Sequence, residues 1–131
     1  GSASAFPWAF WDFLPTAAEL AGVRAPAGID GVSITPTLMG REQKPHEYFY
    51  WEFHELGFHQ AVRIGDWKGI RKGPKMAVEL YDLAADLHES RNVAESHPEM
   101  VKRIEEILAT ARTDDPEWPV LSPEEARKRA V

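Results

Sequence analysis

The sequence contains no cysteine. A disulfide framework, a thiolate zinc site and a cysteine nucleophile are therefore excluded from these 131 residues. The chain also lacks the run of about 18 apolar residues that a membrane-spanning helix needs, and we expect no membrane partner. Residues 1–5 lack the charge and apolar run of a signal peptide, so we expect a cloning remnant or a disordered end there.

Positive charge is scarce as well. Fifteen Lys and Arg against 21 Asp and Glu give a formal net charge of −6, which disfavours nucleic acid as a partner. The charge is nevertheless uneven, because residues 58–75 contain one acid, Asp66, and several basic residues. These are Arg63, Lys68, Arg71, Lys72 and Lys75. Such a strip is most often a solvated face, and binding of an anion is the alternative.

Length and an apolar content of 44% indicate one globular domain over residues 1–131, with 113–131 as a peripheral tail. The pattern near the N-terminus predicts a short helix over 13–21. Asp12 is expected to cap its first turn, and Gly22 suits the left-handed position after its end. Its packing face is expected to consist of Leu14, Ala17, Ala18 and Ala21. Residues 33–40 could hold one further helical turn.

The middle of the chain predicts an antiparallel meander. The first strand is too apolar for clean alternation, so we expect both of its faces to be covered. Gly57 and the pair Gly65-Asp66 mark turns. The four expected strands are 47–53, 59–64, 67–72 and 77–83.

A long amphipathic helix follows. Ser96 and Glu99 have the spacing of a capping box, Pro98 suits the first turn, and an apolar stripe runs along the segment. The stripe consists of Met100, Val101, Ile104, Ile107, Leu108 and Ala111. Ser122 to Glu125 could cap a terminal helix. The predicted fold class is α+β: a small four-stranded antiparallel sheet packed against a long C-terminal helix, with a short N-terminal helix.

The densest titratable cluster consists of Glu52, His54, Glu55 and His59. A zinc-binding H-E-x-x-H helix needs histidines four residues apart, whereas these are five apart in strand context, which excludes that motif. Side chains two apart on a strand share a face, so His54 and Glu52 could pair. The alternative is a solvated hairpin end. No serine lies in a G-x-S-x-G elbow and no calcium loop is present, so we assign neither a catalytic residue nor a metal ligand.

The opening segment is unusually aromatic, with Phe6, Trp8, Phe10, Trp11 and Phe13. A small domain has too little interior to bury all of these rings, and exposed aromatic patches usually mark contact surfaces. We therefore expect this segment to contact another domain, or to mediate self-association through Phe6, Trp8, Phe10 and Trp11.

Several blocks together resemble sulfatases of the arylsulfatase type. Residues 12–22, 29–33 and 38–40 are similar to the segment that follows the catalytic domain in that family. Residues 60–68 and 79–83, with Asp86, Glu89 and 92–94, are similar to its C-terminal subdomain. The blocks occur in the family's order and spacing, from about Trp8 to Leu108.

The resemblance implies a parent enzyme of the alkaline phosphatase superfamily that hydrolyses sulfate esters of small molecules or glycans, in the periplasm or outside the cell. Such a parent uses calcium and a formylglycine made within a C/S-x-P-x-R motif. This chain has no such motif, so we expect no cofactor here and no activity of the chain alone. Its expected partner is an N-terminal catalytic domain, on which it would pack while helping to shape the substrate cleft.

By the same resemblance, the loop with His54, Glu55 and His59 would face the sulfated substrate, with Arg63 behind it. Arg and His donate hydrogen bonds to sulfate oxygens, which suits a cleft rim. Two alternatives stay open. The chain could be an independent module that binds anionic carbohydrate, or part of a related phosphoesterase or phosphonate hydrolase.

Overall fold

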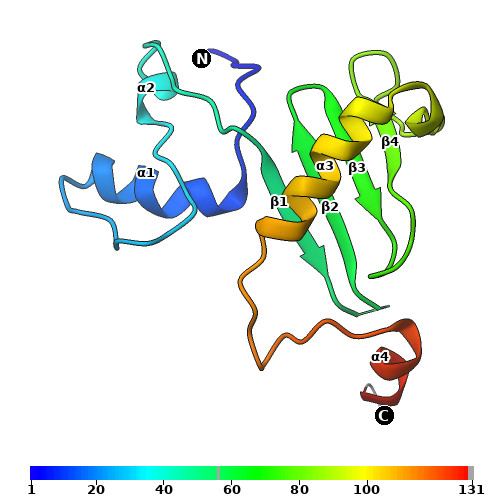
Figure 1. Ribbon diagram of the computed structural model, residues 1–131. Helices are drawn as coiled ribbons and strands as arrows, with labels where there is room; N and C mark the ends of the chain where they lie inside the picture. The colour runs from blue at the N-terminus through cyan, green and yellow to red at the C-terminus, as the bar shows by residue number, and fades with distance from the viewer. Residues whose placement is uncertain (56, 130–131) are drawn as a thin grey trace. The chain divides into compact units, whose positions relative to one another are not determined.

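The computed structural model describes residues 1–55 and 57–129. The chain divides into two compact units, residues 1–47 and residues 48–131. The first unit is helical and the second holds a sheet with a helix against it (Figure 1). No helix in the described part of the chain has the length and apolar character needed to cross a membrane.

In the first unit, a 3₁₀ turn, η1 (Phe10–Asp12), leads directly into helix α1 (Phe13–Leu20), and helix α2 (Thr35–Leu38) follows. The predicted helix is confirmed, and Gly22 has a φ of +70° in the left-handed position after it. The predicted packing face is confirmed at Ala18 and wrong at Leu14 and Ala21, which are exposed. The buried helical side chains are Pro15, Thr16 and Ala18, whereas Leu14 is 51% exposed.

Asp12 does not cap α1 with its side chain, contrary to the prediction. Its helical φ and ψ turn the carboxylate back, where it accepts from the amides of Ala9 and Val32, each at 2.8 Å. His46 Nε2 lies 2.9 Å from Oδ1 of the same carboxylate. Asp12 is completely buried. It therefore joins three separate segments of the first unit.

The second unit contains four antiparallel strands in the order β1-β2-β3-β4, which confirms the predicted meander. Ile64 pairs with Trp67 across the Gly65-Asp66 turn, as the sequence indicates. Burial alternates along β2, so one face of the sheet points into the core. The strands are β1 (Phe49–Phe53), β2 (His59–Ile64), β3 (Trp67–Arg71) and β4 (Glu79–Asp82).

Full coverage of the first strand is not observed. Trp51 is 38% exposed and Phe53 is 46% exposed, while Phe49 is buried. Cross-strand partners share a face, and Trp51 pairs with Ala61, next to the inward-pointing Val62. Trp51 and Phe53 therefore belong to the face opposite the core, which we call the open face.

Helix α3 (Pro98–Thr110) lies across the other face of the sheet (Figure 1). Ile104 and Leu108 of its apolar stripe are almost fully buried and pack with core residues of β2, of β4 and of the segment just before β4, so the helix covers one face of the sheet as predicted. The core consists of Val62, Ile64, Val78, Leu80, Ile104 and Leu108. The helix does not use the predicted capping box. A 3₁₀ turn, η2 (Ala94–Ser96), ends at Ser96, and His97 becomes the N-cap residue without a side-chain hydrogen bond.

The terminal helix α4 (Pro123–Arg129) does have the expected cap. Ser122 Oγ accepts from the Glu125 amide at 3.3 Å, and Glu125 Oε2 accepts from the Ser122 amide at 2.8 Å. Residues 113–122 return along the end of the β1-β2 hairpin, where the Phe58 amide donates to the Leu121 carbonyl.

Gly69 sets how closely α3 approaches the sheet. A Cβ at this position would lie 2.6 Å from Ile104 Cγ2 and 2.8 Å from Ile104 Cδ1. We expect Gly69→Ala to reduce the free energy of unfolding by about 1–3 kcal/mol, measured by urea denaturation, because the helix must shift to relieve the overlap. In an Ile104→Ala background, which removes both atoms, the same change should cost much less. Equal costs in the two backgrounds would contradict this packing.

The Asp12 carboxylate gives a second prediction, for the first unit. Asp12→Ala leaves the amides of Ala9 and Val32 without their acceptor, so we expect a loss of about 3 kcal/mol in local stability. Hydrogen exchange at these two amides should accelerate accordingly. Asp30→Asn, at an exposed position, is the control and should leave exchange unchanged. Unaltered protection in Asp12→Ala would refute the role of the carboxylate.

Candidate functional site

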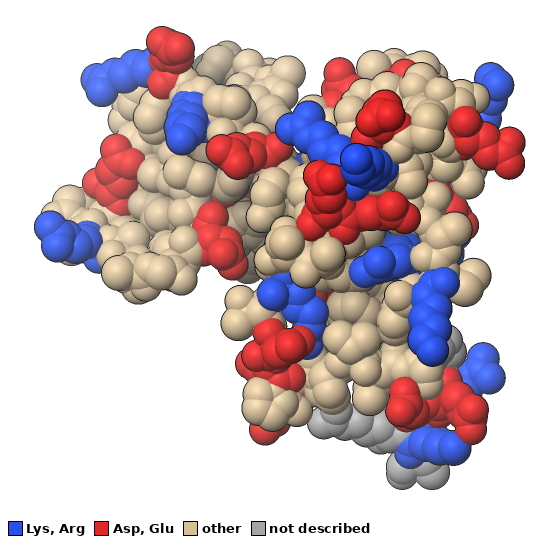
Figure 2. All heavy atoms as spheres, in the orientation of Figure 1, with Lys and Arg blue, Asp and Glu red and all other residues tan. Residues whose placement is uncertain are grey.

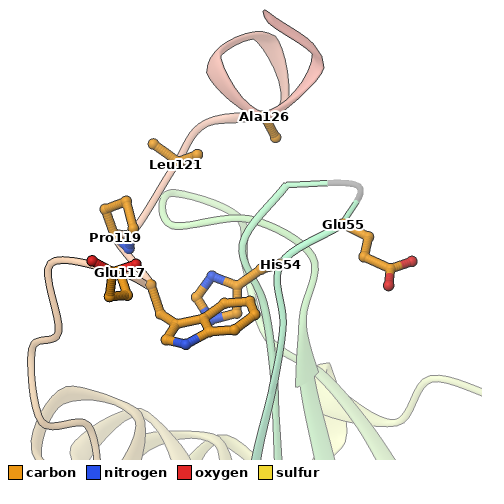
Figure 3. Close-up of a pocket in the computed structure, with 7 residues that line it drawn as sticks. His54, Glu55, Glu117, Pro119, Leu121 and Ala126 are labelled. Carbon is orange, nitrogen blue, oxygen red and sulfur yellow. The ribbon is translucent and has the colours of Figure 1, made fainter. Parts of the chain in front are cut away.

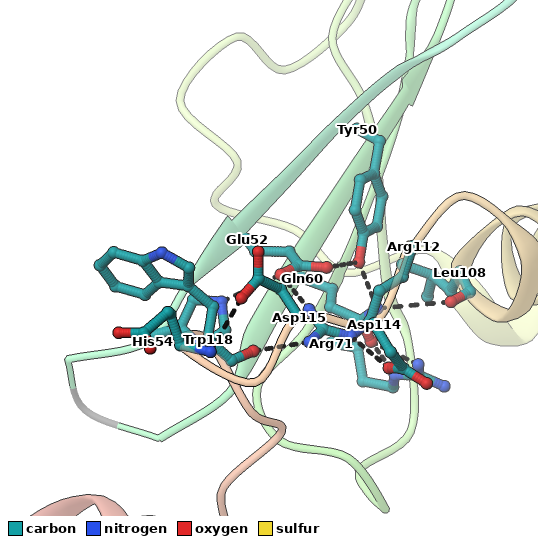
Figure 4. Close-up of polar contacts among 11 residues, drawn as sticks. Tyr50, Glu52, His54, Gln60, Arg71, Leu108, Arg112, Asp114, Asp115 and Trp118 are labelled. Atoms are coloured by element: carbon teal, nitrogen blue, oxygen red, sulfur yellow. Dashed lines mark hydrogen bonds and ion pairs between the residues drawn. The ribbon is translucent and has the colours of Figure 1, made fainter.

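A polar network occupies the end of the sheet below the C-terminal end of α3 (Figure 4). Its centre is Glu52, whose side chain is 18% exposed. Tyr50 Oη donates to Oε1 at 2.5 Å, Arg112 Nη1 donates to Oε2 at 2.5 Å, and His54 Nε2 lies 2.9 Å from Oε2. The pairing of His54 with Glu52 is thus as the strand spacing predicts.

Gln60 extends the network into the core. Its Nε2 donates to Tyr50 Oη at 2.7 Å and to the Leu108 carbonyl at 3.3 Å, while Arg71 donates to its Oε1. Gln60 is 3% exposed, so each of these bonds satisfies a buried polar atom. Among the described residues, no buried side-chain nitrogen or oxygen lacks a partner.

Arg112 connects the network to the segment that follows α3. Besides Glu52, it donates through Nη2 to the Trp118 carbonyl at 2.6 Å and through Nε to Asp114 at 3.1 Å. Its guanidinium also lies 5.2 Å from the centre of the Phe58 ring. These contacts hold residues 113–118 against the hairpin end and bring the Trp118 ring to 5.5 Å from the His54 ring.

The protonation states in the network follow from its contacts. Burial of the Glu52 carboxylate opposes ionisation, but hydrogen bonds from Tyr50, Arg112 and His54 outweigh this and hold its pKa below 4.5. Burial raises the pKa of Tyr50 to about 12, and the nearby Glu52 carboxylate adds to the shift. At neutral pH, Glu52 is therefore a carboxylate and Tyr50 a neutral donor.

His54 and Glu55, two of the residues expected at the cleft rim, line the same pocket (Figure 3). The pocket has a volume of about 550 Å³, and its other walls come from residues 117–121 and from Ala126 of α4. The Trp118 indole lies next to the His54 ring. In Figure 3 the Glu55 carboxylate points away from that ring. The expected loop also contains residue 56, which lies outside the described residues.

His59 and Arg63 lie elsewhere. Both alternate with the inward-pointing Gln60 and Val62 on β2, so they belong to the open face. The His59 ring lies 6.3 Å from the Phe53 ring, and Arg63 Nε donates to the Gly65 carbonyl at 2.8 Å. The structure therefore groups His54 with Glu55, and places Arg63 in a separate pocket with Lys68.

Sequence reasoning missed Tyr50, Gln60, Arg112 and Trp118. Gln60 carried a usable signal, since it is a polar residue at an inward-pointing position of an alternating strand. Arg112 carried none, because 60 residues separate it from Glu52. Around α3, acidic and basic side chains are interspersed and neither sign gathers into a patch (Figure 2).

We expect Glu52→Gln to remove a contribution to the free energy of unfolding that is present at neutral pH and lost on acidification. A carboxylate whose pKa is lowered on folding stabilises the fold above its unfolded pKa of about 4.5, and this contribution disappears as the pH falls through the folded pKa. The variant should be about 1–3 kcal/mol less stable at pH 7, with a smaller difference from the wild type at pH 3. Urea denaturation across this pH range measures both values.

The control for this prediction is Glu105→Gln, which removes one acid from the exposed side of α3. Its stability difference from the wild type should stay small at both pH values. A Glu52→Gln difference that does not shrink on acidification would contradict the assigned charge state.

Comparison with known proteins identifies the family. Residues 9–114 match the family described as N-sulphoglucosamine sulphohydrolase, C-terminal. An N-acetylglucosamine-6-O-sulfatase of Bacteroides thetaiotaomicron is 30% identical over 122 residues, covering 81% of this chain and 22% of that protein. Arylsulfatase K of Danio rerio is 28% identical over 111 residues, covering 78% of this chain and 21% of that protein. The chain thus spans about a fifth of the length of these relatives.

Solved structures agree with this assignment. A 2-O GAG sulfatase superposes with a TM-score of 0.69 at 27% identity, covering 92% of this chain and 26% of that one. A phosphonate monoester hydrolase from Silicibacter pomeroyi also superposes, with a TM-score of 0.62 over 77% of this chain and 24% of that one. Its 19% identity shows a shared fold alone. With the family match covering both units, the chain belongs to the sulfatases and corresponds to their C-terminal subdomain.

Proposed function

We propose that this chain works as the C-terminal part of an enzyme that hydrolyses sulfate esters of sugars. The observation that carries the proposal is the family match over residues 9–114, within relatives that are about five times as long. Two of the compared proteins are named for sulfated glycan chemistry, an N-acetylglucosamine-6-O-sulfatase and a 2-O GAG sulfatase. Sulfated glycans are accordingly the substrate class that we propose.

The groups that cleave the ester would come from the catalytic domain. The described residues do not fit a calcium ion, since no three of their His, Asp or Glu side chains are grouped as metal ligands. The buried Asp12 carboxylate is already occupied by two amides and His46. The sequence has no cysteine, and in Ser96-His97-Pro98-Glu99-Met100 a methionine stands where the formylglycine motif needs arginine. We therefore derive no catalytic step from this chain.

The exposed apolar side chains of the first unit would contact the catalytic domain. Phe10 is 87% exposed, Phe13 is 61% exposed and Trp8 is 51% exposed. Water contact with so many large apolar groups is unfavourable, which supports their burial in an interface. Pairing with a second copy of the chain through Phe6, Trp8, Phe10 and Trp11 is the alternative.

The contribution of this chain to substrate binding would come from the loop after β1. His54 is held by Glu52 and packed between the rings of Phe58 and Trp118, so its position is fixed before any ligand arrives. Glu55 is exposed beside it. A preorganised loop of this kind suits the rim of a substrate cleft, where it would distinguish sugars and not perform the chemistry.

The test is a sulfatase assay on the 131-residue chain and on the full-length enzyme, produced in a host that makes formylglycine. We expect only the full-length enzyme to hydrolyse a chromogenic aryl sulfate. In that enzyme, Glu55→Gln should change kcat/KM several-fold for a sulfated sugar and leave it unchanged for the small aryl sulfate, because only the sugar is large enough to reach the rim.

Glu105→Gln, on the exposed side of α3, is the matched control and should leave both activities unchanged. Turnover by the isolated chain would overturn the assignment of all catalytic groups to another domain. Equal effects of Glu55→Gln on both substrates would overturn the assignment of this loop to the rim.

A further inference from the structure

A second pocket lies on the open face of the sheet, away from the Glu52 network. It has a volume of about 370 Å³, within the range of small-molecule sites. Its floor comes from Trp51 of β1, Arg63 of β2 and Lys68 of β3, and its side from Leu87 and Glu89. Arg63 and Lys68 are direct cross-strand partners, so their side chains leave the sheet next to each other.

The five basic residues within 58–75 differ in the partners that their side chains contact. Arg71 points to the α3 face and donates to Gln60. Lys68 Nζ lies 2.5 Å from a Glu89 oxygen, and Lys72 Nζ lies 2.8 Å from a Glu79 oxygen. Within residues 1–55 and 57–129, Arg63 and Lys75 have no ion pair. Arg63 lines the pocket, whereas Lys75 lies exposed in the turn before β4.

The pocket therefore holds one uncompensated positive charge. Lys68 and Glu89 neutralise each other, and Arg63 uses its Nε hydrogen on the Gly65 carbonyl. The Nη groups of Arg63 keep four further hydrogens, and a guanidinium binds the paired oxygens of a carboxylate or a sulfate in a fork. A ligand with a single anionic group matches this charge.

The other walls fit a sugar ring. The Trp51 side chain is 38% exposed and supplies an aromatic surface, against which the apolar C–H face of a pyranose packs well. Leu87, 76% exposed, adds a second apolar wall. The Glu89 carboxylate, while paired with Lys68, keeps lone pairs that can accept from sugar hydroxyls.

We propose that Arg63, with Trp51 and Lys68, forms a subsite for a sugar residue that carries one sulfate or carboxylate group. The proposal deepens the proposed function, since it rests on a sulfated glycan as the substrate class and assigns a second sugar-binding position to this chain. The position is separate from the loop of His54 and Glu55, because the two pockets share no lining residue.

The test is titration of the 131-residue chain with four probes, followed by NMR. The probes are N-acetylglucosamine 6-sulfate, glucuronic acid, neutral N-acetylglucosamine and inorganic sulfate. We expect at least one anionic sugar to give saturable shifts of the Trp51 indole and the Arg63 side chain. Neutral sugar and inorganic sulfate should bind about tenfold more weakly than the anionic sugar. The neutral sugar lacks the anionic group that Arg63 would bind, and inorganic sulfate lacks the ring that Trp51 would contact. The stronger anionic sugar identifies sulfate or carboxylate as the group recognised.

Variants decide whether the pocket is responsible. Arg63→Ala should weaken binding of the anionic sugar about tenfold or more, and Arg63→Lys should give an intermediate loss because charge remains without the fork. Lys75→Ala removes the other unpaired cation of the strip and should leave affinity unchanged. Equal losses in Arg63→Ala and Lys75→Ala, equal binding of neutral sugar, or no saturable binding would each overturn the proposal.

The readout is binding, so it separates this proposal from the proposed function. A full-length enzyme that hydrolyses sulfate esters while the chain binds none of the sugars would overturn the subsite alone. Binding by the chain without sulfatase activity in the full-length enzyme would overturn the proposed function and support an anionic-carbohydrate module.

Discussion

The absence of a side chain at Gly69 is the constraint on which the second unit depends. It lets Ile104 pack directly on the backbone of β3, and so fixes the height of α3 above the sheet. The end of the helix is thereby fixed too. With the helix at this height, the Leu108 carbonyl accepts from Gln60 and Arg112 reaches Glu52. A change in core packing that moves α3 would therefore also disturb the polar network at the end of the β1-β2 hairpin.

Periodicity in the sequence predicted the elements well, because each strand and helix must present an apolar face to the same core. The meander, the amphipathic helix and the pair of His54 and Glu52 all follow from local spacing. The caps did not. Ser96 is taken up by a 3₁₀ turn, and Asp12 finds better partners in the Val32 amide and His46 than in the first turn of α1. The outcome at Asp12 depends on contacts between distant segments, which no local pattern encodes, whereas that at Ser96 comes from a competing local turn.

In the candidate site too, local spacing predicts which face a residue occupies but not which partners it meets. Alternation on β2 places Gln60 and Arg63 on opposite faces, so neighbouring polar residues in the sequence serve different surfaces. On the α3 face, polar groups satisfy one another and fasten residues 113–118 to the sheet. On the open face, one arginine keeps its charge uncompensated. The basic residues of 58–75, which are close together in the sequence, therefore lie on different faces of the sheet. Arg71 has a structural role on the α3 face, whereas Arg63 lines the proposed ligand pocket on the open face.

The pairing of His54 has a consequence for hydrogen-bond polarity. Glu52 is ionised and can only accept, so the proton of a neutral His54 ring resides on Nε2. Nδ1 is then an acceptor, suited to a hydroxyl or amine of a sugar and repelled by a sulfate oxygen. If this loop forms the rim of the substrate cleft, as proposed, Nδ1 of His54 would accept a hydrogen bond from a sugar hydroxyl group, while Glu52 holds the ring in place.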